Sequence, residues 1–217
     1  MQPAKPVLLS ILTLIIGTLI CHSAMAIEEP NYKLLHSEPP YELREYAPMI
    51  IAEVMVEGDM GSAGNRGFRK LAGYIFGRNT RSPTDTTPDT IAMTAPVVMQ
   101  TSPSPQQRME MTAPVVMSAT SSPQWRMHFV MPSQYQYKDL PIPLDPDVRI
   151  IALPAKRYAV LRFSGFNSLE KTEKLAQELR TWMSKQALKP HGDPQLARYN
   201  PPWTLPFLRR NEILIEY

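Results

Sequence analysis

Three histidines follow the first 26 residues of this chain, His36, His128 and His191. Imidazole is the side chain best suited to bind a metal ion or to move a proton near neutral pH. Only His128 falls within a predicted strand, where alternation places it on the face opposite Trp125 and Phe129. His36 lies in a lead-in segment, and His191 stands beside a proline in a predicted loop. The sequence therefore leaves the metal ligand unknown.

Motifs of the common enzyme classes are absent from the sequence. There is no Gly-x-Ser-x-Gly, no glycine-rich phosphate loop and no His-Glu-x-x-His, and the one cysteine, Cys21, lies in the apolar start of the chain. Glu45, Glu53 and Glu57 occupy polar positions of predicted strands. Two carboxylates that the fold brings together could still act as acid and base. The sequence nevertheless predicts a protein that is not an enzyme.

One apolar phrase occurs twice, because Met-Thr-Ala-Pro-Val-Val-Met stands at residues 93–99 and again at 111–117. As antiparallel neighbours, the two copies would place Met93 and Met111 on one sheet, with each proline where no ladder donor is needed. Thioether side chains adapt well to a planar ring system. Two core strands with ordinary methionines, or a local duplication of the sequence, explain the phrase equally well.

The charge and composition of the chain indicate which kinds of partner it can bind. The 23 Lys and Arg against 20 Asp and Glu give a net charge of +3, and Arg209-Arg210 is the densest basic point. That charge is too small and too scattered to indicate a nucleic-acid partner. The 23 prolines indicate many loops and strand ends, and the 13 methionines indicate adaptable apolar surface.

The first 26 residues have the pattern of a secretory signal peptide. Lys5 supplies positive charge, residues 7–20 are an almost unbroken apolar run, and Ala24-Met25-Ala26 is a small-x-small cleavage site. The run is shorter than the roughly 20 residues of a membrane span. The sequence therefore predicts a signal peptide at 1–26, one domain at 27–217, a periplasmic or secreted location and no stable membrane span after cleavage.

Two amphipathic helices are predicted. The first carries apolar residues at helical spacing, namely Phe68, Leu71, Ala72, Ile75 and Phe76. Ser62 or Asn65 could cap its start, and Gly77 could close its end. The second opens with Asn167 as cap and Glu170 three residues later, and its apolar face comprises Thr172, Leu175, Ala176, Leu179, Trp182 and Met183.

Predicted strands surround both helices, at residues 32–35, 41–46, 49–56, 91–99, 109–118, 125–131, 148–153, 157–164, 197–199 and 211–217. A strand, a glycine turn and a helix occur in residues 50–77 and again in 157–188, and strands follow each helix. The order β-α-β-β therefore occurs twice. It predicts an α+β fold, with two helices flanking an antiparallel sheet that curves into a distorted open β-barrel with a pseudo-twofold repeat.

Several segments in order resemble the SOUL haem-binding protein family. They are Tyr-Glu-Leu-Arg-Glu-Tyr-Ala-Pro at 41–48, Gly-Tyr-Ile-Phe-Gly-Arg-Asn at 73–79, Ile-Ala-Met-Thr-Ala-Pro-Val at 91–97, Met-Pro-Ser-Gln at 131–134, Phe-Ser-Gly-Phe at 163–166, Ala-Arg-Tyr-Asn-Pro-Pro at 197–202 and Arg-Arg-Asn-Glu-Ile at 209–213. The resemblance covers roughly residues 32–217. It implies a distorted barrel with two helices and a pseudo-twofold repeat. It also implies that haem or a related tetrapyrrole is bound in a shallow apolar groove beside the first helix. Together with the missing enzyme motifs, this predicts binding without catalysis.

The resemblance selects a candidate binding site. A haem site needs apolar walls and cations for the propionates, and the candidates are Phe68, Leu71, Ile75, Met93 and Met111 for the walls and Arg66, Lys70 and Arg78 for the charge. Core packing and solvent-facing helix charges are the ordinary alternatives for these residues. Some relatives have a histidine where this chain has Glu45, so the most obvious family iron ligand is missing here.

Two other functions remain open at this point. The protein could bind another flat hydrophobic ligand, because the same fold occurs in effector-binding domains of transcription regulators. It could also be a periplasmic interaction or structural module, with proline-rich loops at 80–90 and 101–107 as its contact surface. Haem is the expected cofactor, and the sequence identifies no protein partner.

Overall fold

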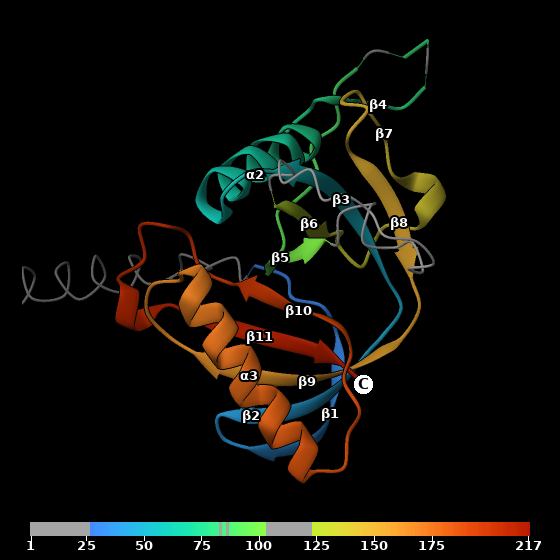
Figure 1. Ribbon diagram of the computed structural model, residues 1–217. Coiled ribbons are helices and arrows are strands. Elements are labelled where there is room, and N and C mark those ends of the chain that lie inside the picture. The colour runs from blue at the N-terminus through green and yellow to red at the C-terminus, as the bar shows by residue number, and fades with distance from the viewer. Residues whose placement is uncertain (1–26, 83, 86, 103–122) are drawn as a thin grey trace, which may run out of the picture.

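The computed structural model describes residues 27–82, 84–85, 87–102 and 123–217 (Figure 1). The strands of this part are β1 (Tyr32–Glu38), β2 (Tyr41–Tyr46), β3 (Met49–Glu57), β4 (Asn79–Thr80), β5 (Val97–Ser102), β6 (Gln124–Val130), β7 (Ile142–Pro143), β8 (Arg149–Leu153), β9 (Lys156–Phe163), β10 (His191–Arg198) and β11 (Asn211–Glu216). The helices are α2 (Met60–Ile75) and α3 (Leu169–Lys185), and the 3-10 turns are η2 (Tyr137–Asp139) and η3 (Pro206–Leu208). No helix in these ranges is long and apolar enough to cross a membrane. The predicted strand at 109–118 lies outside the described residues.

Nine of the strands form one antiparallel sheet in the order β1-β2-β9-β11-β10-β5-β6-β3-β8. The predicted α+β class is confirmed. β1 and β8 are edges of this sheet, so it does not close into a barrel. The predicted strand at 91–99 begins only at Val97, directly after Pro96, because a proline has no N–H to donate to a ladder.

The two halves of the chain exchange strands. β3, β6 and β5 lie side by side, as do β9, β11 and β10, and the two groups meet where β5 pairs with β10. β2, which precedes β3, pairs with β9, and β8, which precedes β9, pairs with β3. Whether the halves superpose about a pseudo-twofold axis stays a prediction.

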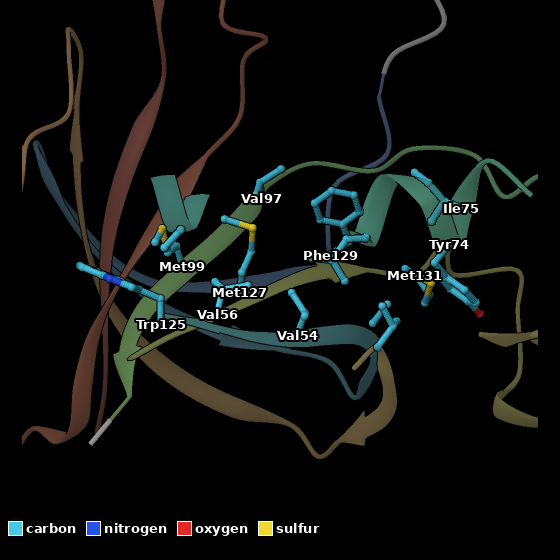
Figure 2. Packing of buried hydrophobic residues seen from close by; sticks show 14 of the residues in the cluster. Val54, Val56, Tyr74, Ile75, Val97, Met99, Trp125, Met127, Phe129 and Met131 are labelled. Carbon is cyan, nitrogen blue, oxygen red and sulfur yellow. The ribbon is translucent and has the colours of Figure 1, made fainter. Parts of the chain in front are cut away.

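Both helices cover the same face of the sheet. α2 packs on β3 and β6, and α3 packs on β9 and β11 (Figure 1). Met99 and Leu196 are register partners on β5 and β10, yet Met99 belongs to the core under α2 and Leu196 to the core under α3. Figure 2 shows the first of these clusters, where Tyr74 and Ile75 of α2 lie beside Met131.

Helix α2 begins one turn earlier than the predicted caps. Asp59 is the N-cap, and its carboxylate accepts hydrogen bonds from the backbone N–H groups of Gly61 and Ser62 at 3.0 and 2.9 Å. Gly77 follows the end of the helix at φ +108°, the left-handed conformation that favours glycine. In α3 the cap is Ser168, whose hydroxyl accepts from the N–H of Lys171.

Candidate ligand-binding site

The apolar candidates beside α2 differ in exposure. Phe68 is 37% exposed, and its ring contacts Phe129 edge-on with 5.5 Å between centroids. Met93 is partly buried against the same core cluster. Leu71 and Ile75 are only 0% and 1% exposed, so they lie in the core beneath the helix rather than on its surface. Met111 lies outside the described residues.

The basic candidates of α2 and the following turn have different partners. Lys70 Nζ forms ion pairs with Asp147 at 2.6 Å and Asp145 at 3.1 Å, and hydrogen bonds to these two carboxylates raise the pKa of Lys70. The guanidinium of Arg66 donates to the backbone carbonyl of Glu57. Arg78 is exposed. Lys70 is thus already neutralised, whereas the charge of Arg78 faces solvent.

The histidines do not come together. His36 and His191 are exposed on β1 and β10, and His128 is buried in β6. Burial, with the nearby charge of Arg126, lowers the pKa of His128 to about 3, so its imidazole is neutral at physiological pH. No group of three or more His, Cys, Asp or Glu side chains suited to a metal occurs among the residues that the structure describes.

Glu45, where the family resemblance led us to expect an iron ligand, lies on β2. Arg157 Nε donates to its carboxylate at 2.7 Å across the ladder between β2 and β9. This residue therefore belongs to a partly exposed ion pair and offers no imidazole to a bound iron.

Sequence reasoning missed a buried charge cluster on the face of the sheet opposite the helices. We call Arg44, Tyr199, Arg210 and Glu212 the Glu212 cluster. Arg44 donates from Nη1 and Nη2 to the Glu212 carboxylate at 2.8 and 3.1 Å, Tyr199 donates at 2.7 Å, and Arg210 Nε donates at 2.9 Å. Both Arg44 and Glu212 are almost fully buried. The signal in the sequence was Glu212 directly before the apolar run Ile-Leu-Ile of the last strand.

Three cavities of about 250, 230 and 210 Å³ lie elsewhere. The first adjoins Thr94, Met131 and Pro132, and the second lies between Met60 of α2 and Ala176 of α3. The third lies on the face opposite the helices, beside His128. None of these three cavities is lined by Phe68, Met93 or another candidate of the α2 surface.

Solved structures share the fold at low sequence identity. The chain is similar to the EcmrR C-terminal domain, with a TM-score of 0.53 and 10% identity over 85% of this chain and 96% of that one. It is also similar to a hydrolase from Listeria innocua, with a TM-score of 0.52 and 11% identity over 83% and 93%. At these identities the likeness defines the fold class alone.

The sequence comparison identifies the family. The SOUL heme-binding protein family matches residues 27–109 and 100–216, and the chain belongs to this family. The human Heme-binding protein 2 is 31% identical over 156 residues, which are 70% of this chain and 67% of that protein. The mouse Heme-binding protein 2 is 30% identical over 153 residues, or 68% and 65% of the two chains. The match thus spans about two thirds of these relatives.

Proposed function

We propose that this protein binds haem or another tetrapyrrole, without catalysis, on a shallow apolar surface beside α2. Membership of a heme-binding family carries the proposal, because the family match covers nearly all of residues 27–217. The two similar mammalian proteins are themselves named for haem binding. A binding role also fits the lack of catalytic motifs in the sequence.

The surface beside α2 supplies the contacts that a flat ring needs. Phe68 presents a partly exposed ring, and we propose that Met93 and Met111 contact the same ligand. Leu71 and Ile75 lie beneath and hold this wall in place. Arg66 and Arg78 supply positive charge for the propionates. Lys70 would have to break its ion pairs with Asp145 and Asp147 before it could bind a propionate. With Glu45 in an ion pair, recognition relies on ring shape more than on iron coordination.

Replacing Phe68 by glutamate is expected to weaken hemin binding by about tenfold or more. The substitution removes an apolar contact of about 1.5–3 kcal/mol and brings a negative charge near the propionates. Titrations with hemin and with iron-free porphyrin measure the effect, and both ligands are expected to lose affinity equally.

The matched control is Leu34→Glu, which places the same charge at an exposed apolar position on β1, at the other end of the sheet. This variant is expected to bind like the unmodified protein. Unchanged affinity in a folded Phe68→Glu variant would place the tetrapyrrole away from α2.

We also propose that residues 1–26 are removed on export and that the mature domain, residues 27–217, is periplasmic or secreted. The support is the short apolar run followed by Ala24-Met25-Ala26. Mass spectrometry of the exported protein is expected to show Ile27 at the amino terminus. Full-length protein in the membrane fraction would contradict this.

A further inference from the structure

Arg198, at the end of β10, lies on the face of the sheet that the helices cover. Leu196 belongs to the core under α3, and Ala197 belongs to the cluster on the opposite face. Because side chains alternate along a strand, Arg198 is turned toward the helices. A Cβ atom on Gly64 of α2 would lie 3.6 Å from Nη2 of Arg198. The guanidinium therefore lies directly beside the buried side of α2.

This guanidinium has no acidic partner among the residues that the structure describes. Arg44 and Arg210, in contrast, both pair with Glu212. Burial lowers the pKa of Arg198, and no nearby carboxylate opposes that effect. Arginine nevertheless stays protonated in proteins. A partly buried positive charge without a partner destabilises the folded chain, so its presence indicates a role in function rather than in stability.

Arg198 also lies in one row with residues of the proposed haem surface. Val97 on β5 pairs with Arg198 on one side and with Phe129 of β6 on the other (Figure 2). The ring of Phe68 contacts Phe129, with 5.5 Å between the centroids. Two strand spacings, or about 10 Å, separate the backbones at Phe129 and Arg198. The cation thus lies one strand beyond the apolar contacts that Phe68 and Phe129 offer to a flat ring.

We propose that Arg198 binds a carboxylate of the ligand, and that the protein therefore selects tetrapyrroles with free propionates. This inference rests on the proposed haem-binding function. The macrocycle lies against Phe68, and one propionate extends across Val97 to the guanidinium. The planar fork of arginine donates two parallel hydrogen bonds to a carboxylate.

Arg198 is better suited to this role than the exposed Arg66 and Arg78. It is only partly exposed, so a ligand group can reach it while much of the surrounding water is excluded. Attraction between opposite charges is stronger where the local dielectric constant is lower.

Mesoporphyrin IX and its dimethyl ester test this inference. The two compounds share one macrocycle, but only the free acid has carboxylates. Fluorescence titrations of the purified protein with both compounds, in one detergent-containing buffer, measure the two affinities. The free acid is expected to bind at least about tenfold more tightly than the ester, which corresponds to about 1.4 kcal/mol.

Arg198→Met keeps the length and the apolar stem of the side chain but removes its charge. This variant is expected to lose about tenfold in affinity for the free acid and to bind the ester as the unmodified protein does. Its stability without ligand, measured by urea unfolding, is expected to be unchanged or higher, because the unpaired charge is gone. Arg198→Lys restores a charge without the fork and is expected to recover part of the preference.

The matched control is Arg162→Met, at an exposed arginine of β9 that pairs in register with Glu212 on the opposite face. It is expected to keep both affinities. Equal binding of acid and ester to the unmodified protein would overturn this inference and leave the proposed function intact. An unchanged preference in a destabilised Arg198→Met variant would also overturn it, because the arginine would then serve folding. If neither compound nor hemin binds, the proposed function is wrong, and this inference with it.

Discussion

Glu212→Leu is expected to lower the free energy of unfolding by about 3–5 kcal/mol, the cost of removing one partner of a buried ion pair. Arg44 then keeps only the Glu42 carboxylate, at 2.6 Å. Glu212 is fully buried and accepts hydrogen bonds from Arg44, Tyr199 and Arg210. Leucine would fill much of the space but would leave the Arg44 guanidinium, itself 1% exposed, without a carboxylate on that side. Urea unfolding followed by circular dichroism measures the loss.

Glu45→Gln is the matched control in the same sheet. Glu45 also pairs with an arginine, Arg157, but that pair is largely exposed and is expected to contribute less than about 1 kcal/mol. Similar losses in the two variants would show that burial does not govern the strength of the Glu212 cluster.

The Glu212 cluster also predicts acid sensitivity. Burial alone would raise the pKa of Glu212, but hydrogen bonds and charge from Arg44, with Tyr199 and Arg210, outweigh burial and lower it. A glutamate in the unfolded chain has a pKa of about 4.3. The stabilisation is therefore complete above that pH and is lost as the pH falls through the lower folded value. Unfolding free energies measured from pH 6 to pH 3 are expected to fall less steeply for Glu212→Leu.

Leu71→Ala is expected to destabilise the protein by about 2–5 kcal/mol, because it empties a fully buried position under α2. Leu205→Ala, at an exposed leucine, is the control and is expected to change stability by less than about 0.5 kcal/mol.

The same variant separates a core residue from a ligand contact. Because Leu71 has no exposed surface, hemin affinity of folded Leu71→Ala is expected to stay within about a factor of three of the unmodified protein, well below one decade or 1.4 kcal/mol. A tenfold loss of affinity in protein that circular dichroism shows to be folded would mean that Leu71 contacts the ligand.

The helices could be predicted from the sequence because their apolar spacing reflects packing on one sheet face. The caps could not, since Ser, Asn and Asp all cap well and several stand near each start. The sequence favours Ser62 or Asn65 as the cap of α2, whereas the structure has Asp59, whose carboxylate accepts from two backbone N–H groups. Alternation in β6 was predicted correctly, with Trp125 and Phe129 on the helix side.

The candidate site was harder to predict, because the spacing that turns Leu71 and Ile75 toward a core also suits a ligand wall. Helical periodicity gives the face of a residue but not what covers that face. The Glu212 cluster was out of reach for another reason. Arg44 and Glu212 are separated by 168 positions, and only the strand order brings them together.

The strands exchanged between the two halves of the chain affect the rate at which the protein folds. β2 pairs with β9, so that Glu45 meets Arg157 at a separation of 112 positions, and β11 lies between β9 and β10 although it follows both in the chain. Pairings of such high contact order form slowly, and they leave strand edges open in the meantime. A nascent chain cannot complete this sheet until β11 has emerged. Each half lacks one flanking strand until the other half has been made, and a chaperone that shields open edges is expected to raise the yield of native protein.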